Sequence, residues 1–342
     1  MNEERQRLIL AQETDDEQIV NISLRPAKLD EFIGQREIVD NLKVALTAAQ
    51  KRKEQLEHIL LSGSPGLGKT SLAHIIAHEM GSKITATSGP AIERAGDLIG
   101  ILTNLEAGDI LFIDEIHRLS KTVEEFLYPA MEGFQIDFVI DKGPYAKTIK
   151  FNLKPFTLVG ATTRSGLLAS PLRNRFGIFH HLDFYPAEDL SRIVKDSAKK
   201  LNLSIEDASA EEIARRARGT PRIANRLLRR VRDWAQVKEP ADKITRDIVA
   251  RALKSLGIDE MGLDEADRRF LKTIIEHYDG GPVGIETLAA TLNEELDTLE
   301  DTIEPFLLKI GFLRRTSRGR EAAPSAYRHF GLNPKNPQKE LF

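Results

Sequence analysis

Residues 63–70 have the types and spacing of a loop that binds phosphate. The sequence Gly-Ser-Pro-Gly-Leu-Gly-Lys-Thr fits the pattern GxxxxGK(S/T) and lies between an apolar run, residues 58–62, and a helical pattern that begins at Thr70. Glycines let successive backbone N–H groups turn toward a phosphate, and the positive end of the following helix adds to the attraction. Lys69 would reach the β- and γ-phosphates, and the Thr70 hydroxyl would ligate Mg²⁺. We therefore predict a nucleotide site that contains Gly63, Gly66, Gly68, Lys69, Thr70 and Ser71.

Two adjacent acids end a second apolar run. Residues 109–114 (Asp-Ile-Leu-Phe-Ile-Asp) have the pattern of a buried strand, and Glu115 follows directly. Beside a bound nucleotide, Asp114 would hold the magnesium shell and Glu115 would polarise the attacking water. The alternative is a pair of solvated acids that cap a helix, which the phosphate-binding loop disfavours. His117 lies nearby without companions at metal-ligand spacing, and we interpret it as structural.

Two threonines and two arginines follow a third apolar run, residues 156–161. Thr162 and Thr163 are placed to hydrogen-bond a γ-phosphate or the water. Arg173 and Arg175 come soon after. An arginine donated by a neighbouring subunit would stabilise the charge of phosphoryl transfer and couple hydrolysis to assembly. Spacing alone leaves it equally open that either arginine is a plain surface residue.

The elements that must position these residues follow an α/β pattern. Short apolar strands separated by helical stretches predict a parallel sheet with crossover helices. Residues 135–153 instead alternate with period two on both sides of a turn that contains Gly143 and Pro144, which predicts an inserted antiparallel hairpin. Residues 188–256 have an almost wholly helical pattern. The fold class expected is α/β, with a P-loop core and an all-α region after it.

The C-terminal part of the chain combines three predicted helices with a basic pair of strands around Gly319. Residues 259–304 contain fourteen acidic and three basic residues, whereas residues 306–330 contain six basic residues and one acidic residue. The net charge of −3 therefore excludes nothing, because screening limits a local field to about 8–10 Å. The pattern predicts a winged helix whose wing contacts the DNA backbone regardless of base sequence, through Arg315, Arg318 and Arg320.

The composition narrows the class of protein. The 342 residues are 41% hydrophobic and 30% charged, which is typical of a soluble chain of two or three domains. The absence of Cys excludes a disulfide scaffold, a Cys nucleophile and a Cys-ligated zinc. No apolar stretch approaches the roughly 20 residues of a membrane helix, and the acidic first twenty residues lack a signal-peptide core. We expect a cytoplasmic protein that does not contact membranes.

Together these motifs resemble those of the AAA+ ATPases. The residues that carry the resemblance lie in 63–70, 111–117, 160–164 and 170–177. More specifically, the chain resembles the RuvB family, the bacterial motors for branch migration of Holliday junctions. That likeness runs from about Leu24 to Gly331, and its most specific segments are 24–35, 127–132, 214–226 and 311–320.

The resemblance implies a particular domain organisation, with ATP and ADP as nucleotides and Mg²⁺ as cofactor. The core would be an AAA+ ATPase domain, followed by an all-α lid and a C-terminal winged helix. The expected order is a flexible segment (1–20), the core (21–185, with the hairpin at 135–153), the lid (186–257), the winged helix (262–333) and a loose tail (334–342).

The resemblance also assigns roles to single residues. Leu24 and Arg25 would border the adenine, and Tyr185 would lie against the nucleotide near the hinge. Arg175 would be the arginine finger presented to the next subunit's nucleotide. Arg222 would be the sensor-2 arginine on the lid.

The partners that the resemblance implies are RuvA, RuvC and duplex DNA inside a hexameric ring. The protein would drive branch migration in DNA recombination and repair as part of the SOS response. The hairpin would dock RuvA, because exposed apolar side chains on a hairpin usually mark an interface. Its expected contact residues are Phe138, Val139, Ile140 and Tyr145. The alternative is a hairpin that folds onto its own domain.

Three positions depart from the family pattern. Ser64 replaces a Pro in the phosphate loop, where the backbone matters more than the side chain. Ser317 replaces a Pro in the wing turn and would loosen it. Leu296 stands where relatives often carry Arg, which would remove one phosphate contact.

The sequence leaves two alternative functions open. An AAA+ loader or initiator would act without processive movement, but an initiator needs a helix that reads bases. An ATP-binding transcription regulator would need the same kind of helix. The third helix of the winged-helix segment is acidic and disfavours both.

Overall fold

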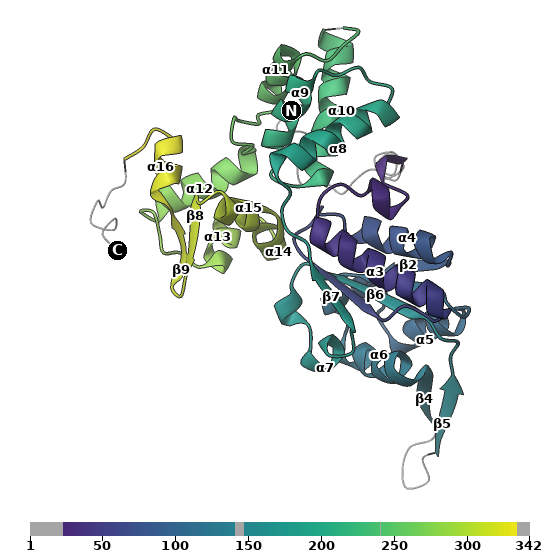
Figure 1. Ribbon diagram of the computed structural model, residues 1–342. Helices are drawn as coiled ribbons and strands as arrows, with labels where there is room; N and C mark the ends of the chain where they lie inside the picture. Colours follow the sequence, from purple (N-terminus) through teal and green to yellow (C-terminus); the bar gives the residue numbers. More distant parts are fainter. Residues whose placement is uncertain (1–22, 141–146, 240, 334–342) are drawn as a thin grey trace. The chain divides into compact units, whose positions relative to one another are not determined.

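The computed structural model describes residues 23–140, 147–239 and 241–333. These residues form two compact units, Leu24–Tyr185 and a second unit that begins at Pro186 (Figure 1). Parallel strands and helices build the first unit, and helices dominate the second, so the predicted α/β fold is confirmed. The predicted segments 1–20 and 334–342 lie outside the described residues, as do residues 21 and 22, which were predicted to begin the core.

The first unit is built on a five-stranded parallel sheet with the order β2-β3-β6-β1-β7. Its strands are β1 (Ile59–Ser62), β2 (Ile84–Ser88), β3 (Ile110–Asp114), β6 (Thr157–Thr162) and β7 (Ile178–His181). All residues of β1 and β6 are buried, as the apolar runs predict. The edge strands β2 and β7 were not anticipated, because polar residues interrupt them and they are only half-buried.

Helices cover both faces of this sheet (Figure 1). On one face lie α3 (Arg36–Arg52) and α4 (Lys69–Met80), and on the other lie α5 (Ala95–Thr103) and α6 (Lys121–Gly133). The helix α7 (Ser170–Arg173) is one turn long, and four 3₁₀ turns connect the elements: Leu29–Glu31, Gly89–Ala91, Ile116–Arg118 and Ser165–Leu167. Because β3, β6 and β1 are neighbours, the three predicted motifs follow adjacent strands and meet at the carboxyl edge of the sheet.

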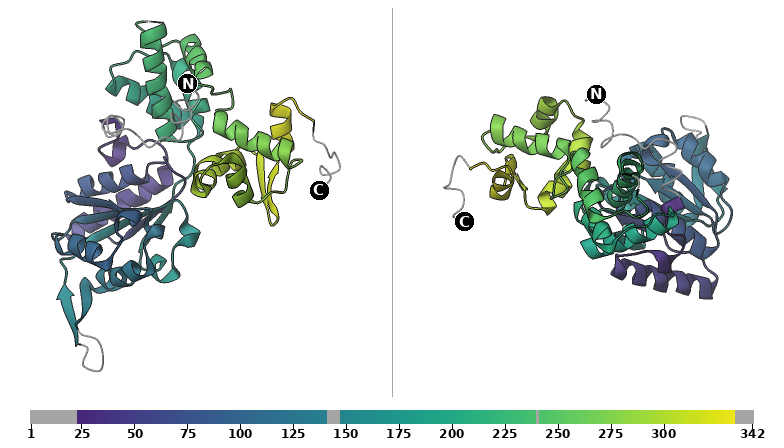
Figure 2. Two further views of the ribbon diagram at one scale, coloured as in Figure 1. Left: turned by 180° about the vertical axis from the view of Figure 1, so that it is seen from behind. Right: turned by 90° about the horizontal axis from the view of Figure 1, so that it is seen from above.

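An antiparallel hairpin leaves the first unit directly after α6. Its strands are β4 (Gln135–Ile140) and β5 (Lys147–Asn152), paired from Gln135 with Asn152 to Ile140 with Lys147. The hairpin extends away from the sheet, as Figure 1 and the left view of Figure 2 show. The predicted insertion is therefore present as a separate two-stranded sheet.

The second unit begins with four helices and continues into a compact winged-helix arrangement. The four helices are α8 (Ala187–Lys200), α9 (Asp207–Arg216), α10 (Pro221–Lys238) and α11 (Arg246–Ser255). The winged-helix part contains α12 (Glu265–His277), α13 (Ile285–Leu292), α14 (Leu296–Thr298), a π-helical turn (Leu299–Ile303), α15 (Glu304–Lys309), β8 (Leu313–Thr316), β9 (Gly319–Ala322) and α16 (Pro324–His329). The third predicted helix is thus present as α14, the π-helical turn and α15 in direct succession. Phe270, Leu288 and Leu307 lie in the buried core of the winged-helix part.

Candidate functional site

The predicted phosphate-binding loop joins β1 to α4 and has a backbone that glycine adopts most easily. Gly63, Gly66 and Gly68 have φ values of 137°, 79° and 105°, where an L side chain is strained. A Cβ atom on Gly63 would also lie 2.5 Å from the carbonyl oxygen of Leu182. The loop ends at the N-terminus of the 12-residue helix α4, where free N–H groups attract anions. Its shape therefore suits a bound phosphate.

Lys69 begins α4 and folds back over this loop. The residue is only 6% exposed, and its Nζ donates to the carbonyl oxygens of Gly63 at 2.7 Å and Ser64 at 3.1 Å. The contact with Ser64 involves its backbone, so it does not depend on the side chain that departs from the family pattern. Thr70 and Ser71 follow in the first turn of α4 and are half-buried.

Glu115 lies at the end of β3 and contacts the residue that follows β6. Its φ of 47° places it in the left-handed region, a conformation often found at functional sites. Its Oε2 accepts hydrogen bonds from the Thr163 backbone N–H at 3.3 Å and the Thr163 hydroxyl at 3.1 Å. Its own N–H donates to Oδ1 of Asp114 at 3.0 Å. The structure therefore brings the two acids and Thr163 together.

Thr162 has a different place from Thr163. It is fully buried, and its Oγ1 accepts from the Arg164 backbone N–H at 3.0 Å. The same Oγ1 lies 2.9 Å from Nδ1 of His117, which in turn lies 3.2 Å from Oε2 of Glu115. His117, interpreted from sequence as structural, thus joins two candidate residues. Its position two residues after Glu115 was the available signal, but contact across strands is not visible in a sequence.

Of the residues expected beside the nucleotide, Tyr185 contacts the loop and Arg25 lies near α4. Tyr185 is 4% exposed, and its hydroxyl donates to the carbonyl oxygen of Leu67 at 3.1 Å. Leu24 is 5% exposed, and Arg25 is half-buried. Arg25 lies close enough to α4 that its charge, after the larger effect of burial, lowers the pKa of His74.

Arg175 is held against α6 of its own unit. Its guanidinium lies 4.5 Å from the centre of the Tyr128 ring, and it donates to the carbonyl oxygen of Pro171 at 2.7 Å. It also pairs with Oε1 of Glu132 at 3.0 Å, which leaves its side chain 22% exposed. Arg173 is exposed and lies over the ring of Phe179.

Arg222 belongs to the second unit. It is the second residue of α10, at the N-terminal end of that helix, and it is exposed. The structure therefore places it on the helical lid.

The wing places Arg315 and Arg318 on the surface, as expected of residues that contact DNA. Both are exposed, Arg315 in β8 and Arg318 in the turn before β9. Ser317 lies in the same exposed turn. Gly319 follows with a φ of 137°, and a Cβ there would lie 2.4 Å from the carbonyl oxygen of Val283.

Arg320 was predicted to contact DNA, but the structure places it inside the fold. It is 8% exposed, and its guanidinium pairs with Glu304 at 2.9 Å and Glu300 at 3.4 Å. Arg315 lies directly opposite Arg320 in the hairpin, so the two share a face, and Arg315 also approaches Glu304 at 3.8 Å while its side chain stays 63% exposed. Arg320 therefore holds the wing onto the third helix. Two of the acids in that helix face the wing, which weakens the repulsion that the sequence suggests.

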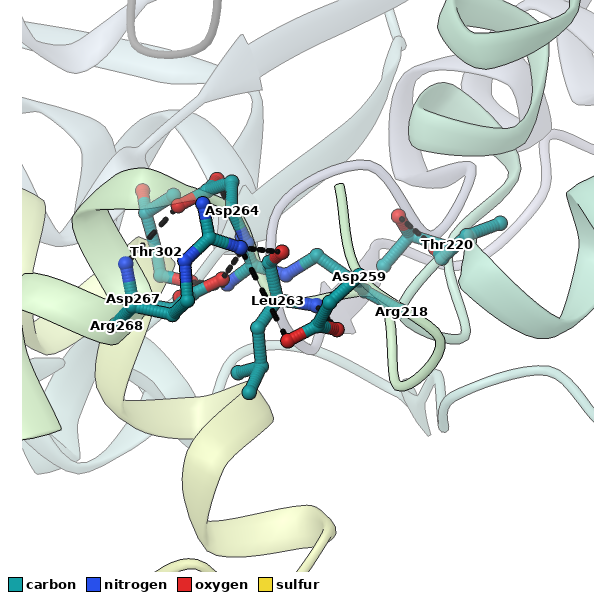
Figure 3. Close-up of polar contacts among 9 residues, drawn as sticks. Arg218, Thr220, Asp259, Leu263, Asp264, Asp267, Arg268 and Thr302 are labelled. Atoms are coloured by element: carbon teal, nitrogen blue, oxygen red, sulfur yellow. Dashed lines mark hydrogen bonds and ion pairs between the residues drawn. The ribbon is translucent and has the colours of Figure 1, made fainter. Parts of the chain in front are cut away.

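The sequence patterns did not reveal a buried arginine at the junction of lid and winged helix. Arg218 donates to Asp264 at 3.1 Å, to Asp267 at 3.0 Å and to the carbonyl oxygen of Thr302 at 3.0 Å (Figure 3). It also lies over the ring of Phe306, and it is 6% exposed. Burial raises the pKa of Asp267 to about 8, against the opposing effect of Arg218. Only the spacing of Asp264 and Asp267, that of a helix capping box, was visible in the sequence.

The hairpin residues expected to dock RuvA are described only in part. Phe138, Val139 and Ile140 lie in β4, but their side chains and the whole of Tyr145 lie outside the described residues. On the paired strand, Phe151 is 47% exposed. This is an apolar side chain on the hairpin surface, as an interface requires.

Neither a protein-built metal cluster nor a membrane helix is found in the described part of the chain. No group of three His, Cys, Asp or Glu side chains there is arranged to hold a metal ion. None of its helices is long and apolar enough to span a bilayer.

Sequence models of three domains match nearly all of the described chain. They are the Holliday junction DNA helicase RuvB P-loop domain at residues 24–182, the RuvB AAA lid domain at 185–259 and the RuvB C-terminal winged helix domain at 260–331.

Solved structures of similar chains give the same result. The Thermotoga maritima RuvB Holliday junction branch migration motor is 55% identical, with a TM-score of 0.85 over 91% of this chain and 99% of that one. A mutant of Thermotoga maritima RuvB is 55% identical, with a TM-score of 0.85 over 92% of this chain and 99% of that one.

Proposed function

The chain belongs to the RuvB family of Holliday junction DNA helicases and is an AAA+ P-loop ATPase; from this premise we propose that it drives branch migration of four-way DNA junctions together with RuvA and RuvC. We propose further that it works as a homohexameric ring on duplex DNA, in the cytoplasm, during recombination, repair and the SOS response. The observation that carries the proposal is the meeting of the Gly63–Lys69 loop, Glu115 and Thr163 at one edge of the sheet.

The proposed site suits ATP or ADP with Mg²⁺. Mg²⁺ is usually held by one or two protein oxygens together with substrate phosphates and water. The Thr70 hydroxyl and the Asp114 carboxylate would supply those oxygens, and the bound ion would neutralise charge on the phosphates. Lys69 would exchange its contacts with the loop carbonyls for the β- and γ-phosphates, since its Nζ already lies over the loop.

Glu115 would orient the water that attacks the γ-phosphate. Its contacts with Thr163 hold the carboxylate at the end of β6, and Thr163 would sense whether a γ-phosphate is present. Thr162 and His117 support this pair from the buried side. Leu24, Arg25 and Tyr185 would border the nucleotide.

Arg175 and Arg222 would complete the site from elsewhere. In a head-to-tail ring, Arg175 would stabilise charge on the nucleotide of the next subunit. Arg222 would bring the lid to the phosphates. Hydrolysis in one subunit would then depend on the presence of its neighbour.

The DNA contacts proposed are those of the wing. Arg315 and Arg318 would bind phosphates, which are the same in every sequence, as a motor that moves along any DNA requires. The hairpin of β4 and β5 would dock RuvA, because it extends from the core and carries exposed Phe151.

The experiment is ATP-dependent dissociation of a synthetic four-way junction, with and without RuvA. We expect two duplexes to form only with ATP, and we expect Lys69→Ala to abolish the reaction through lost phosphate binding. Lys83→Ala is the matched control, since Lys83 is an exposed lysine of the same unit. ATP hydrolysis that leaves the junction intact even with RuvA would contradict the motor and favour a loader.

A further inference from the structure

Arg175 is restrained by residues that lie on one face of α6. Tyr128 and Glu132 are four residues apart, so their side chains lie one above the other on the helix surface. The ring of Tyr128 lies under the guanidinium, and Glu132 holds one of its nitrogens. The carbonyl oxygen of Pro171 accepts from the other terminal nitrogen of the guanidinium at 2.7 Å. Three contacts of different kinds therefore set the direction of one side chain.

The helix that carries Tyr128 and Glu132 is itself firmly placed. Its other face packs into the core of the unit, with Val123, Leu127 and Ala130 fully buried. The hydroxyl of Tyr128 donates to Oε2 of Glu124 at 3.1 Å. Glu124 is 6% exposed, and burial raises its pKa. The side chain of Tyr128 is thus held at its hydroxyl by Glu124, and its backbone is fixed by the packing of α6.

These contacts are poorly explained as a source of stability. The side chain of Glu132 is 62% exposed, and ion pairs in such surroundings contribute little to folding. The Nε atom of Arg175 is buried with no hydrogen-bond partner in the structure, which is unfavourable. What the contacts achieve is orientation, because an arginine side chain otherwise has many rotamers.

Arg173 shows what an unrestrained arginine of the same segment looks like. It is exposed, it contacts the ring of Phe179 at 5.1 Å, and among the described residues it has no carboxylate partner. Spacing left open whether Arg173 or Arg175 has a role, and only Arg175 is oriented by the structure.

We infer that Tyr128 and Glu132 are positioning residues for Arg175, which hold its guanidinium in the direction from which it reaches the nucleotide of the next subunit. The inference rests on the proposed function, in which Arg175 acts in trans. A restrained arginine loses less rotamer freedom when it engages a phosphate. Tyr128 and Glu132 therefore affect the active site of the next subunit and not that of their own subunit.

The test separates these two sites by mixing subunits. An Arg175→Ala chain keeps its own nucleotide site but lacks the finger, and a Glu115→Gln chain keeps the finger but cannot hydrolyse ATP. We expect mixed rings, assembled on duplex DNA with ATP, to regain ATPase activity at each interface where a Glu115→Gln chain presents Arg175 to an Arg175→Ala chain.

Tyr128→Leu is then added to one chain at a time. On the Glu115→Gln chain, which donates the finger, we expect the regained rate to fall by about 5- to 10-fold. On the Arg175→Ala chain we expect no change in the regained rate. Glu132→Ala on the donor chain should lower the rate by about threefold, and Glu125→Ala, an exposed acid on the same helix, should leave it unchanged. Tyr128→Phe keeps the ring and should lose less than about twofold.

The outcomes distinguish the inference from its premise. If the mixture of Arg175→Ala and Glu115→Gln regains no activity, both the assignment of Arg175 and the inference fall. If activity returns but Tyr128→Leu lowers it equally on either chain, the residue acts by folding and the inference alone falls. If Tyr128→Leu has no effect on the donor chain, the inference is wrong while the finger stands.

Discussion

Arg175 and Arg218 are held by similar contacts in regions that differ in exposure. The guanidinium of Arg175 lies 4.5 Å from the centre of the Tyr128 ring, and that of Arg218 lies 4.6 Å from the centre of the Phe306 ring. Both side chains also donate to a backbone carbonyl oxygen. The contact types alone do not tell the two arginines apart.

The carboxylates that pair with Arg175 and Arg218 differ in how far they are exposed to water. Glu132, the partner of Arg175, has a side chain that is 62% exposed, whereas Asp264 and Asp267, the partners of Arg218, are 7% and 0% exposed. Water cannot solvate a buried charge that has lost its partner, whereas it can solvate an exposed charge. Arg218 is therefore fixed as part of the junction between lid and winged helix, and Arg175 remains available to another partner.

Arg320 belongs with Arg218 by this criterion. Its partner Glu304 has a side chain that is 3% exposed. Among the arginines expected to bind phosphate, it is the one that the structure places inside the fold. Arg315 lies 3.8 Å from the same carboxylate, but its own side chain is 63% exposed, against 9% for Arg320. Burial of both the arginine and its carboxylate therefore separates structural arginines from functional ones better than position in a motif.

The largest effect is expected when Arg175 is removed. Arg175→Ala should slow ATP hydrolysis by the assembled protein about 10³- to 10⁵-fold, because a finger stabilises the charge of the transition state. Its midpoint of thermal unfolding should stay close to that of the wild type, since a pair whose carboxylate is 62% exposed contributes little to stability. Steady-state ATPase rates and thermal melting check both points, with Arg173→Ala as the control. A tenfold loss or less would remove Arg175 from the reaction.

Removal of Arg218 should affect stability instead. Arg218→Ala leaves Asp264 and Asp267 buried without their partner, which should lower the free energy of unfolding by about 3–5 kcal/mol. Urea unfolding followed by the fluorescence of Trp234, the one tryptophan of the chain, reports on the lid. Arg192→Ala, which removes an arginine that is 60% exposed from a loose 3.5 Å pair with Asp189, should cost less than about 1 kcal/mol. Equal effects of the two variants would mean that burial does not distinguish the arginines.

Arg318 and Arg320 repeat the comparison within the wing. Arg318→Ala should weaken DNA binding about equally for all sequences and reduce the salt dependence of log K by about 1, without affecting stability. Arg320→Ala should instead destabilise the winged helix, because buried Glu304 loses its nearer partner and keeps only Arg315 at 3.8 Å. Fluorescence anisotropy with labelled duplexes at several salt concentrations, together with thermal melting, separates the two effects. An unchanged melting temperature for Arg320→Ala would mean that Arg320 does not hold the wing onto the third helix.

The two regions should also respond to pH in opposite directions. Burial raises the pKa of Asp267, so the folded chain keeps a proton that the unfolded chain loses near pH 4, and stability falls as the pH rises toward about 8. Burial lowers the pKa of His58, whose Nε2 lies 3.0 Å from the carbonyl oxygen of Met131 at the end of α6. The unfolded chain gains that proton first, so stability falls as the pH drops below about 6.5.

Two variants isolate these protons. The difference in melting temperature between wild type and Asp267→Asn should shift against the wild type as the pH rises from 4 to about 8. The difference between wild type and His58→Gln should shift against the wild type on acidification. A difference that stays flat over the stated range would show that the group does not titrate differently in the folded and unfolded chains.

Much of the nucleotide site was predictable because each of its parts is local. A glycine-rich loop after an apolar strand has the same shape wherever it occurs, since sterics restrict φ and ψ. Two acids after a buried strand must likewise emerge at its end. The parallel sheet, the hairpin and the helical regions also followed from residue periodicity, which is a local property.

The contacts of His117 and Thr163 with Glu115, and the orientation of Arg175 by Tyr128, were not predictable in this way. They join residues of different strands or helices, and no spacing in the chain specifies such a meeting. The burial of Arg320 was missed for a related reason. The wing is a run of arginines, and only its docking on the third helix determines which of them face inward.

The sequence by itself determined which residues are chemically able to bind a nucleotide and DNA, because residue type and local backbone preference need only near neighbours. The tertiary structure alone decided which arginines are left to do so. That choice depends on whether an arginine is buried together with its carboxylate, as Arg320 is and Arg315 is not, and burial is a property of the packed chain.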